Sequence, residues 1–425
     1  MSSIVEKDKQ FVWHPFTQHF TADDPIEIVR AEGVRLFDAE GNDYIDANSS
    51  WWVNVHGHGN EYIGKAMLEQ FNTIDHIVFA GVTHPKAVEL AERIVKLTPD
   101  HLQKVFFSDN GSTSVEIALK MIVQYWSNKN VKKDRFLAMH GSYHGDTFGA
   151  MSVGQRGYFN APFEPFFFDV DYIDFPDGKN EDAILSRAKV LFETGEFAGM
   201  IVEPLVQGAA GMRMYSAEFL DKLASLAKEN DVLIIYDEVM TGFGRTGKMF
   251  ATDHCKVKPD FMTMSKGLTA GVIALGLTVT SDEIYNAFLG EETTKALLHG
   301  HSFTANPISC AVACANLDLF EQEAAIQGMA NLEQWNNEFQ VELKQFDFVT
   351  NIRQQGTILA FEIETGEGNT YFSNIKAEAY AYFMKAGILI RPLGNVIFIN
   401  APFIISKEDY KLITDSIIGF LKRGE

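Results

Sequence analysis

Cysteine and basic residues are both scarce in this chain. Three cysteines occur among 425 residues, and their positions, 255, 310 and 314, give no CxxC spacing. A disulfide framework like that of small secreted domains is therefore excluded. Lysine and arginine number 36 against 57 acidic residues, and the formal net charge is −21. This balance argues against a nucleic-acid partner, because binding to phosphate backbones needs clustered basic side chains.

Long apolar runs are missing as well. No stretch of about 18 apolar residues occurs, so no membrane-spanning helix is predicted. The segment MSSIVEKDKQF has no apolar core of the kind found in secretory signal peptides. We therefore expect a cytoplasmic protein with neither a membrane nor a nucleic-acid partner. The hydrophobic content of 46% is that of an ordinary globular protein, and the length suits one large domain with a smaller companion.

The pattern of apolar residues changes twice along the chain. Residues 33–48 alternate apolar and polar side chains and predict a β-hairpin. Helical patterns at 112–126 and 216–230 lie among short apolar runs, which predicts a mostly parallel sheet with helices on both faces. These predicted buried strands are 104–109, 135–140, 198–205, 232–239, 260–266 and 274–280.

The last hundred residues have a different pattern, which predicts an α+β tail. A helical stretch after about residue 320 precedes apolar runs at 356–363, 388–392 and 396–402, a helix around 371–386 and a final helix. We expect this tail to join the N-terminal hairpin. The predicted organisation is a large domain over residues 60–315 and a small domain built from residues 1–59 and 316–425, with a cleft between them.

Two charged residues stand at the ends of predicted buried strands. Asp237 ends the run VLIIYD, at the edge where parallel α/β sheets bind ligands, although an acid there can also simply cap a turn. Lys266, in TMSKGLTAG, has small neighbours that leave room for a bulky group at its amine. A lysine at a strand end is more commonly solvated, but a desolvated one loses its proton readily and becomes a nucleophile.

Two further turns follow predicted strands. In FFSDNGSTSVEIALK, Gly111 and Ser112 open a helix, whose free N–H groups suit an anion such as phosphate. Capping alone would also explain Ser112 or Asp109. In MHGSYHGDTFGA, Tyr143 could stack on a flat heteroaromatic ligand or pack as part of a glycine-rich turn.

Two patterns compete with this interpretation. Residues 242–247 spell GxGxxG, but residues 237–241 separate them from the strand end, and KMFATDHC makes a poor helix. A dinucleotide-binding fold needs both features, so an NAD enzyme is a weak alternative. Histidines recur at close spacing in the pairs His56/His58, His140/His144 and His299/His301. No HExxH motif accompanies them, and a metal hydrolase is a second weak alternative.

In combination, the strand-end Asp237, Lys266 of MSKG, the Gly111–Ser112 helix start and Tyr143 of SYHG resemble the class III aminotransferases. The segments DEVMTGFGRTG and EPLVQGAAGM are similar to that family too. The resemblance spans nearly the whole chain. It implies an α/β, fold-type I, pyridoxal 5′-phosphate (PLP)-dependent transferase, with a mostly parallel sheet in its large domain and a smaller α+β domain.

The resemblance also implies roles for individual residues. Lys266 would bind PLP covalently, Asp237 would pair with the pyridinium nitrogen, and Tyr143 would stack on the ring; these three are the expected catalytic residues. The other implied cofactor contacts are Gly111, Ser112, Glu203 and Ser302. The serine at 302 would come from the neighbouring subunit, which implies a homodimer.

Three segments are similar to one branch of the class: WHPFTQ, SSWWVNVHGHG and ILIRPLGNVIFINAP. That branch acts in biotin synthesis and converts 8-amino-7-oxononanoate to 7,8-diaminononanoate. The resemblance implies that Trp51 and Trp52 line an apolar channel and that Arg391 holds the distal carboxylate of this acceptor. The other implied substrate contacts are Phe16, Tyr143, Lys266 and Gly300.

Two departures from the family pattern bear on this expectation. Phe16 stands where the family often has tyrosine, and Ser302 where the class often has threonine. The missing hydroxyl at position 16 leaves the amino donor open between S-adenosylmethionine, which is usual in the branch, and lysine. Three other possibilities stay open. The chain could catalyse another class III reaction or be a non-catalytic binding protein, and the tryptophan pair could serve only in packing.

Overall fold

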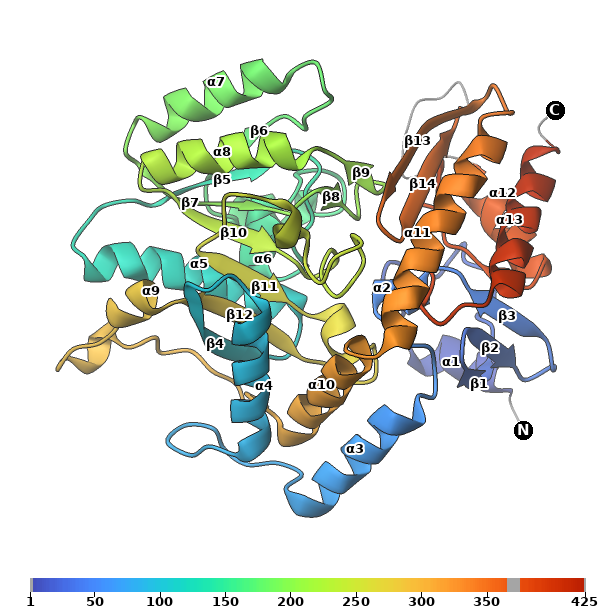
Figure 1. The fold of residues 1–425 in the computed structure, drawn as a ribbon, viewed down its shortest axis with the longest axis horizontal. Coiled ribbons are helices and arrows are strands. Elements are labelled where there is room, and N and C mark those ends of the chain that lie inside the picture. Colours follow the sequence, from blue (N-terminus) through green and yellow to red (C-terminus); the bar gives the residue numbers. More distant parts are fainter. Residues whose placement is uncertain (1–2, 365–374, 424–425) are drawn as a thin grey trace.

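A seven-stranded sheet forms the centre of the computed structural model, which describes residues 3–364 and 375–423 (Figure 1). Its strand order is β4-β12-β11-β10-β7-β5-β6. The strands are β4 (Leu102–Ser108), β5 (Arg135–Met139), β6 (Val170–Ile173), β7 (Phe197–Val202), β10 (Leu233–Asp237), β11 (Phe261–Met264) and β12 (Gly276–Ser281). β12 is antiparallel to both neighbours and the other pairs are parallel, which confirms the predicted mostly parallel sheet.

Helices cover both faces of this sheet. Successive residues of β10 point to opposite faces. Ile235 packs in the apolar cluster of α5, whereas Ile234 and Tyr236 pack in the cluster of α7 and α8. A strand buried on both sides needs a continuous apolar run, which is why the central strands could be recognised in the sequence. The helices around the sheet are α5 (Gly111–Asn128), α6 (Phe148–Val153), α7 (Glu181–Phe192), α8 (Ala217–Glu229) and α9 (Asp282–Asn286).

Segments from the two ends of the chain form two smaller sheets. One has the order β1-β2-β3-β15 and the other β13-β14-β16. Their strands are β1 (Ile28–Glu32), β2 (Arg35–Asp38), β3 (Asp43–Asp46), β13 (Val349–Gln355), β14 (Ile358–Ile363), β15 (Ile388–Leu389) and β16 (Val396–Ile399). β2 and β3 are the predicted hairpin, and β15 adds to β3 in parallel, joining the two ends of the chain.

The remaining elements connect these sheets. The other helices are α1 (Ile4–Phe11), α2 (Ser49–Trp52), α3 (Glu61–Thr73), α4 (Pro85–Leu97), α10 (Pro307–Phe320), α11 (Glu323–Leu343), α12 (Ile375–Lys385) and α13 (Lys407–Leu421). The short pieces are β8 (Val206–Gln207), β9 (Arg213–Met214) and the 3₁₀ helices η1 (Ala161–Phe166), η2 (Ala251–His254), η3 (Lys266–Thr269) and η4 (Thr293–Lys295). None of the described helices is long and apolar enough to cross a membrane.

Several elements of the tail differ from their predicted bounds. Of the apolar runs, 356–363 forms a strand only from Ile358, and 396–402 only as far as Ile399. The helix expected around 371–386 is α12, and residues 371–374 lie outside the described part of the chain. The strand expected over 388–392 ends at Leu389. It stops because the side chain of Asn48 accepts the N–H of Arg391, at 2.6 Å, and because Pro392 has no N–H to donate.

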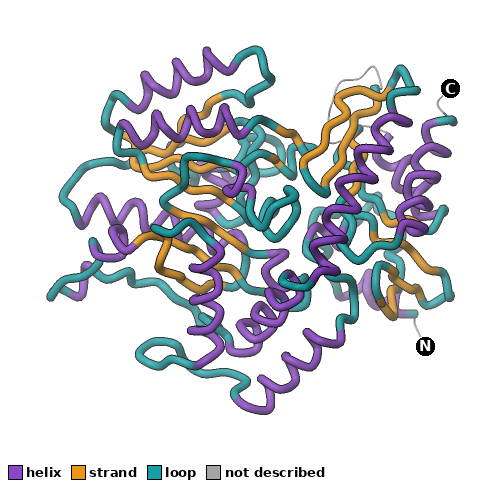
Figure 2. The backbone as a smooth tube through the Cα atoms, viewed as in Figure 1, coloured by secondary structure: helices purple, strands orange, loops and turns teal. Residues whose placement is uncertain are grey.

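The central sheet and the terminal sheets form separate groups of strands, with helices and loops between them (Figure 2). This arrangement supports the division into a large domain over 60–315 and a small one from 1–59 and 316–425. The boundaries stay a prediction. One apolar cluster runs across them, since it contains Val34 and Phe361 from the terminal segments together with Phe107 and Leu277 from the central sheet.

Candidate active site

A cavity of about 270 Å³ lies where β10 and β11 end. Its lining brings together Trp52, Gly111, Ser112, Tyr143, Glu203, Asp237 and Lys266, all expected from the sequence, with Asn110, His144, Gly145, Val239, Met240 and Ser265. The expected residues meet because the carboxyl ends of parallel strands lie at one edge of a sheet, and the loops that follow them share that edge.

Asp237 is buried and its carboxylate is fixed by three neighbours. Nδ1 of His144 lies 2.7 Å from Oδ2, and Oδ1 accepts the hydroxyl of Thr263 and the N–H of Val239, both at 3.1 Å. Thr263 pairs directly with Asp237 on the adjacent strand. The carboxylate therefore presents a negative charge of fixed orientation to the cavity.

His144 and Thr263 are site residues that sequence reasoning missed. His144 is fully enclosed, and its Nε2 has no hydrogen-bond partner within the described ranges. A signal for it existed, because the residue stands beside Tyr143 at the end of β5. Thr263 gave a weaker signal, as the residue expected opposite Asp237 once two neighbouring parallel strands are aligned.

Glu203 is a second buried acid in the cavity. Its carboxylate accepts the N–H of Tyr143 at 3.0 Å and the N–H of Gly208 at 2.9 Å. Burial raises the pKa of Glu203 to about 7, and the nearby charge of Asp237 acts in the same direction. Near neutral pH this group is poised between its charged and neutral forms.

We expect a pH-dependent stability difference between the cofactor-free wild type and Glu203→Gln. The folded pKa lies above the ordinary value of 4.5, so the protonated acid favours folding below pH 4.5 and this contribution is lost as pH rises through about 7. Gln leaves one of the two N–H donors without an acceptor at every pH. The wild type's advantage should therefore shrink by about 3 kcal/mol between pH 4.5 and 8, measured by urea unfolding. Parallel stability curves for the two proteins would contradict the assignment.

Lys266 lies two residues after the end of β11 and has a left-handed backbone, with φ of 45°. Burial lowers the pKa of its amine, and the charges of Asp237 and Glu203 oppose this shift. The amine Nζ lies 5.1 Å from the ring centroid of Trp52. A buried amine that gives up its proton readily can act as a nucleophile and as a general base.

The start of α5 offers hydrogen-bond donors to the same cavity. The side chain of Asn110 caps the helix by accepting the N–H of Thr113 at 3.0 Å. The N–H groups of Gly111 and Ser112 have no acceptor among the described residues. A Cβ at position 111 would lie 2.7 Å from Val239, and one at Gly145 would overlap Ser112. Glycine at these positions thus lets two loops close around free donors that suit an anion.

Tyr143 supplies a flat, partly buried ring to the lining. Its hydroxyl donates to Oδ2 of Asp146 at 3.0 Å. Burial raises the pKa of Tyr143, and the charge of Asp146 raises it further, so the hydroxyl keeps its proton. The ring can therefore pack against a planar ligand while its hydroxyl stays a neutral donor.

The two neighbouring tryptophans point to different places. Trp52 is 5% exposed and lines the cavity, whereas Trp51 is 48% exposed and does not. The ring of Trp51 meets Phe16 edge to face, with centroids 5.6 Å apart, and the guanidinium carbon of Arg391 lies 5.5 Å from its centroid. An apolar surface with one cation beside it is the arrangement expected for a chain that ends in a carboxylate.

Besides Trp51, four expected site residues lie outside the cavity lining of a single chain: Phe16, Gly300, Ser302 and Arg391. All four are exposed. Phe16 and Arg391 flank Trp51, as described above, and so belong to one surface region. Gly300 and Ser302 lie on the loop between η4 and α10. The predicted role of Ser302 in a neighbouring subunit stays a prediction.

The GxGxxG segment at 242–247 has a structural role here. Arg245 is buried, and its guanidinium donates to the carbonyl oxygens of Trp52, Asn54 and Ala401. No α-helix follows the segment, only the 3₁₀ helix η2. A dinucleotide site needs the glycines to open a helix, so the NAD alternative loses its structural basis. For the metal alternative, no cluster of three or more potential ligands occurs within the described ranges.

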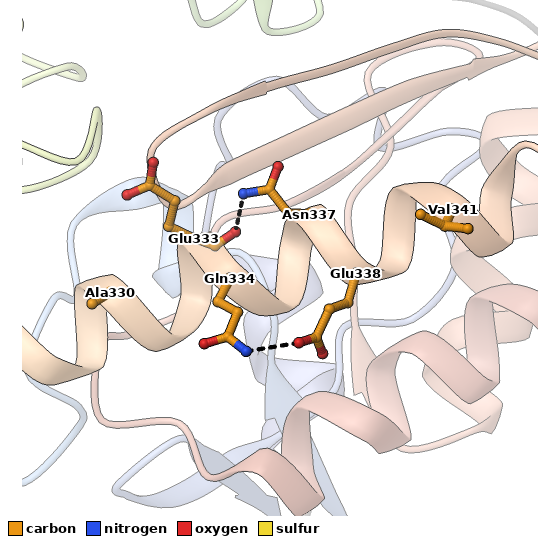
Figure 3. A pocket seen from close by; sticks show the side chains of 6 residues that line it. All are labelled: Ala330, Glu333, Gln334, Asn337, Glu338 and Val341. Carbon is orange, nitrogen blue, oxygen red and sulfur yellow. Dashed lines mark hydrogen bonds between the residues drawn. The ribbon is translucent and has the colours of Figure 1, made fainter.

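A larger hollow, of about 530 Å³, lies along one face of α11 (Figure 3). Its six lining residues all come from that helix. Two of their side-chain amides are bonded along the helix, Gln334 to Glu338 at 2.8 Å and Asn337 to the carbonyl of Glu333 at 3.0 Å. The smaller cavity at β10 and β11 is the better candidate, because residues from six separate segments converge there.

Comparison with known proteins gives a consistent family assignment. The sequence model of the family described as aminotransferase class-III matches residues 19–421. The chain is 42% identical over 419 residues to the adenosylmethionine-8-amino-7-oxononanoate aminotransferase of Synechococcus elongatus, covering 96% of this chain and 98% of that protein. It is 39% identical over 428 residues to the protein of the same name from Staphylococcus aureus, covering 96% and 95%.

Solved structures give the same result. The adenosylmethionine-8-amino-7-oxononanoate aminotransferase of Methanocaldococcus jannaschii superposes with a TM-score of 0.93 at 36% identity, covering 98% of both chains. An (S)-enantioselective omega-transaminase from Thermomicrobium roseum superposes with a TM-score of 0.89 at 28% identity, covering 99% of this chain and 97% of that one. The similarity therefore includes the terminal sheets as well as the central one.

Proposed function

The chain belongs to the class III aminotransferases, and we propose that it transfers an amino group to the ketone of 8-amino-7-oxononanoate, forming 7,8-diaminononanoate in biotin synthesis. The observation that carries the proposal is the full-length match to relatives named for this reaction. The site geometry supports it, because a nucleophilic lysine, a buried acid and an anion-binding helix start share one cavity.

PLP is the proposed cofactor, and the residues of the cavity fit it. The free N–H groups of Gly111 and Ser112 suit its phosphate. The fixed carboxylate of Asp237 suits a protonated ring nitrogen, and Lys266 supplies the amine that would hold the aldehyde. When bound, PLP supplies the carbonyl that carries the amino group and the ring that withdraws electrons.

The chain's own residues hold and move protons around this group. Lys266 would take the proton from the donor α-carbon and later return one to the acceptor carbon. Asp237 keeps the proton on the ring nitrogen, and His144 keeps Asp237 in place through its 2.7 Å contact. Tyr143, which lines the cavity, would offer its flat ring to the bound cofactor. Donor and acceptor use one site in turn, so ping-pong kinetics are expected.

The surface around Trp51 supports a long-chain acceptor. Trp52 lies beside Lys266, and Trp51 lies outside the cavity between Phe16 and Arg391. The two rings can pack along the methylene chain of 8-amino-7-oxononanoate, and the guanidinium can bind its far carboxylate through a bidentate pair. Gly300 and Ser302 would complete the substrate and phosphate contacts from a second subunit, which makes a homodimer part of the proposal.

Trp52→Ala is expected to raise the KM for 8-amino-7-oxononanoate by at least about tenfold, because the apolar contact to the acceptor chain is lost. The measurement is steady-state kinetics with each substrate varied. Trp335→Ala, a change of the same size on α11, serves as the control and should leave this KM unchanged. An unchanged KM in Trp52→Ala would remove its role in acceptor binding.

S-adenosylmethionine is the proposed donor, as the relatives' names indicate. Phe16 lacks a hydroxyl, so lysine is the alternative. The test adds each amine separately to the PLP-loaded enzyme and follows the visible absorbance of the cofactor. Loss of the cofactor's resting absorbance band on adding S-adenosylmethionine supports the proposal. Loss of the band with lysine alone would identify lysine as the donor. A response to neither, with turnover of other amines, would favour a different class III reaction.

We also propose a cytoplasmic location for the reaction. All three cysteines are free and buried, which suits a reducing compartment. Burial raises the pKa of the Cys255 thiol to about 12 and that of Cys314 to about 12, so these thiols are protonated and unreactive at neutral pH. A catalytic role for cysteine forms no part of the mechanism.

A further inference from the structure

A buried carboxylate outside the cavity supports the turn that carries the two tryptophans. Asp46 ends β3 and is fully buried. Its Oδ1 accepts the N–H of Ser50 at 2.9 Å, and its Oδ2 accepts the hydroxyl of Ser50 at 2.7 Å. Nε2 of His58 lies 3.0 Å from the same Oδ2. No step of the proposed reaction uses this acid, so its burial needs another explanation.

The supported turn has an unusual backbone. Four consecutive residues, none of them glycine, are left-handed: φ is 50° at Ser49, 44° at Ser50, 69° at Trp51 and 72° at Trp52. This conformation is unfavourable for residues with a Cβ and persists only where the surroundings fix it. Ser50 lies in the middle of the turn, and its N–H and its hydroxyl both donate to Asp46.

A buried cation holds the far side of the same turn. Arg245 donates to the carbonyl oxygens of Trp52 at 3.3 Å and of Asn54 at 3.2 Å. Burial lowers the pKa of Arg245, and the charge of Asp46 opposes that shift. The turn thus contacts both a buried anion, Asp46, and a buried cation, Arg245. Loss of Asp46 removes hydrogen bonds from the turn and a favourable charge from Arg245.

The turn is also tied to the segment after β15 that carries Arg391. The carbonyl of Asn48 accepts the N–H of Trp52 at 2.9 Å. The side chain of Asn48 accepts the N–H of Arg391 at 2.6 Å and donates to the carbonyl of Phe398 at 3.0 Å. A shift of the turn would therefore move both tryptophans relative to Arg391.

We propose that Asp46 is a positioning residue for the amino acceptor. By fixing Ser50 in its left-handed conformation, the carboxylate places Trp52 in the cavity and Trp51 beside Arg391. This inference rests on the proposed function, because it assigns the two rings to the acceptor chain. It predicts that the chemistry at Lys266 survives the loss of Asp46 better than acceptor binding does.

The test compares Asp46→Ala with the wild type as PLP-loaded enzymes. The KM for 8-amino-7-oxononanoate should rise by at least about tenfold, since small displacements of positioning groups have effects of that size. The rate of the donor half-reaction should change much less. Asp43→Ala, on the same strand and paired with Arg35, is the matched control and should leave the acceptor KM unchanged. An unchanged acceptor KM, or equal losses in both half-reactions, would overturn the proposal.

Two further variants separate positioning from general stability. Asp46→Asn keeps one acceptor for the N–H of Ser50 and should show a smaller rise in KM. Adding Ser50→Gly to Asp46→Ala should recover part of the acceptor affinity, because glycine adopts positive φ without a steric penalty. A carboxylate needed only for folding would not be rescued in this way, and failure of the rescue would contradict the proposal.

A double-mutant cycle tests whether Asp46 acts through the turn. In a Trp51→Ala, Trp52→Ala background, Asp46→Ala should add little to the acceptor KM, whereas independent effects would multiply. The near-UV circular dichroism provides a readout independent of the substrate, since two of the five tryptophans lie in the turn. If Asp46→Ala changes this signal and Ser50→Gly restores it while 8-amino-7-oxononanoate is not turned over, the proposed acceptor is wrong and the positioning role stands. An unchanged signal would overturn the positioning role itself.

Discussion

Lys266→Ala is expected to lower the rate of amino transfer by about 10⁴-fold or more, because it removes both the amine that holds the cofactor and the general base. No second lysine lines the described cavity, so no neighbouring amine can replace it. The variant should still bind some PLP through the start of α5 and Asp237. Single-turnover kinetics with the donor measure the effect directly.

The control for this variant is Lys256→Ala, which removes an exposed lysine after η2 and should retain full activity. A small primary amine added to Lys266→Ala should restore part of the rate, since it supplies the missing base. Normal turnover in Lys266→Ala would refute the assignment of the catalytic lysine, and with it most of the proposed mechanism.

Asp237→Asn should lower kcat by about 10² to 10³-fold, an effect typical of losing a fixed charge next to developing charge. The amide keeps nearly the same shape; its oxygen can still accept the hydroxyl of Thr263, and its NH₂ can donate to Nδ1 of a neutral His144, so folding should persist. What changes is the charge available to hold a proton on the ring nitrogen. Stopped-flow absorbance of the donor half-reaction is the appropriate measurement.

Asp134→Asn is the matched control, because Asp134 is exposed and lies before β5, away from the cavity lining. Its kcat should equal that of the wild type. If Asp237→Asn kept its kcat and lost only affinity for one substrate, Asp237 would be a substrate ligand and would have no role in proton retention.

The central sheet could be predicted because its strands are buried on both faces. A run such as VLIIYD leaves no polar position, and the polar residue that ends it falls at the ligand-binding edge. Asp237 and Lys266 could for this reason be placed at the ends of buried strands. The contact between His144 and Asp237 joins residues 93 positions apart, and no local pattern encodes it.

The turn at residues 49–52 shows why the rest could not be predicted. SSWW contains no glycine, and four left-handed residues contradict local preference. The conformation depends on distant partners, including Arg245 and the carbonyl of Asn400, which accepts the hydroxyl of Ser49 at 2.7 Å. The structural role of the GxGxxG segment could not be predicted for the same reason, since the contacts of Arg245 exist only in the folded chain.

The most direct test of the proposed function is product formation by the purified, PLP-loaded protein. 8-Amino-7-oxononanoate would be supplied with S-adenosylmethionine or with lysine, and 7,8-diaminononanoate detected by mass spectrometry. We predict product with wild type and none with Lys266→Ala. Absence of product with either donor, from an enzyme that aminates other ketones, would contradict the assignment of the acceptor.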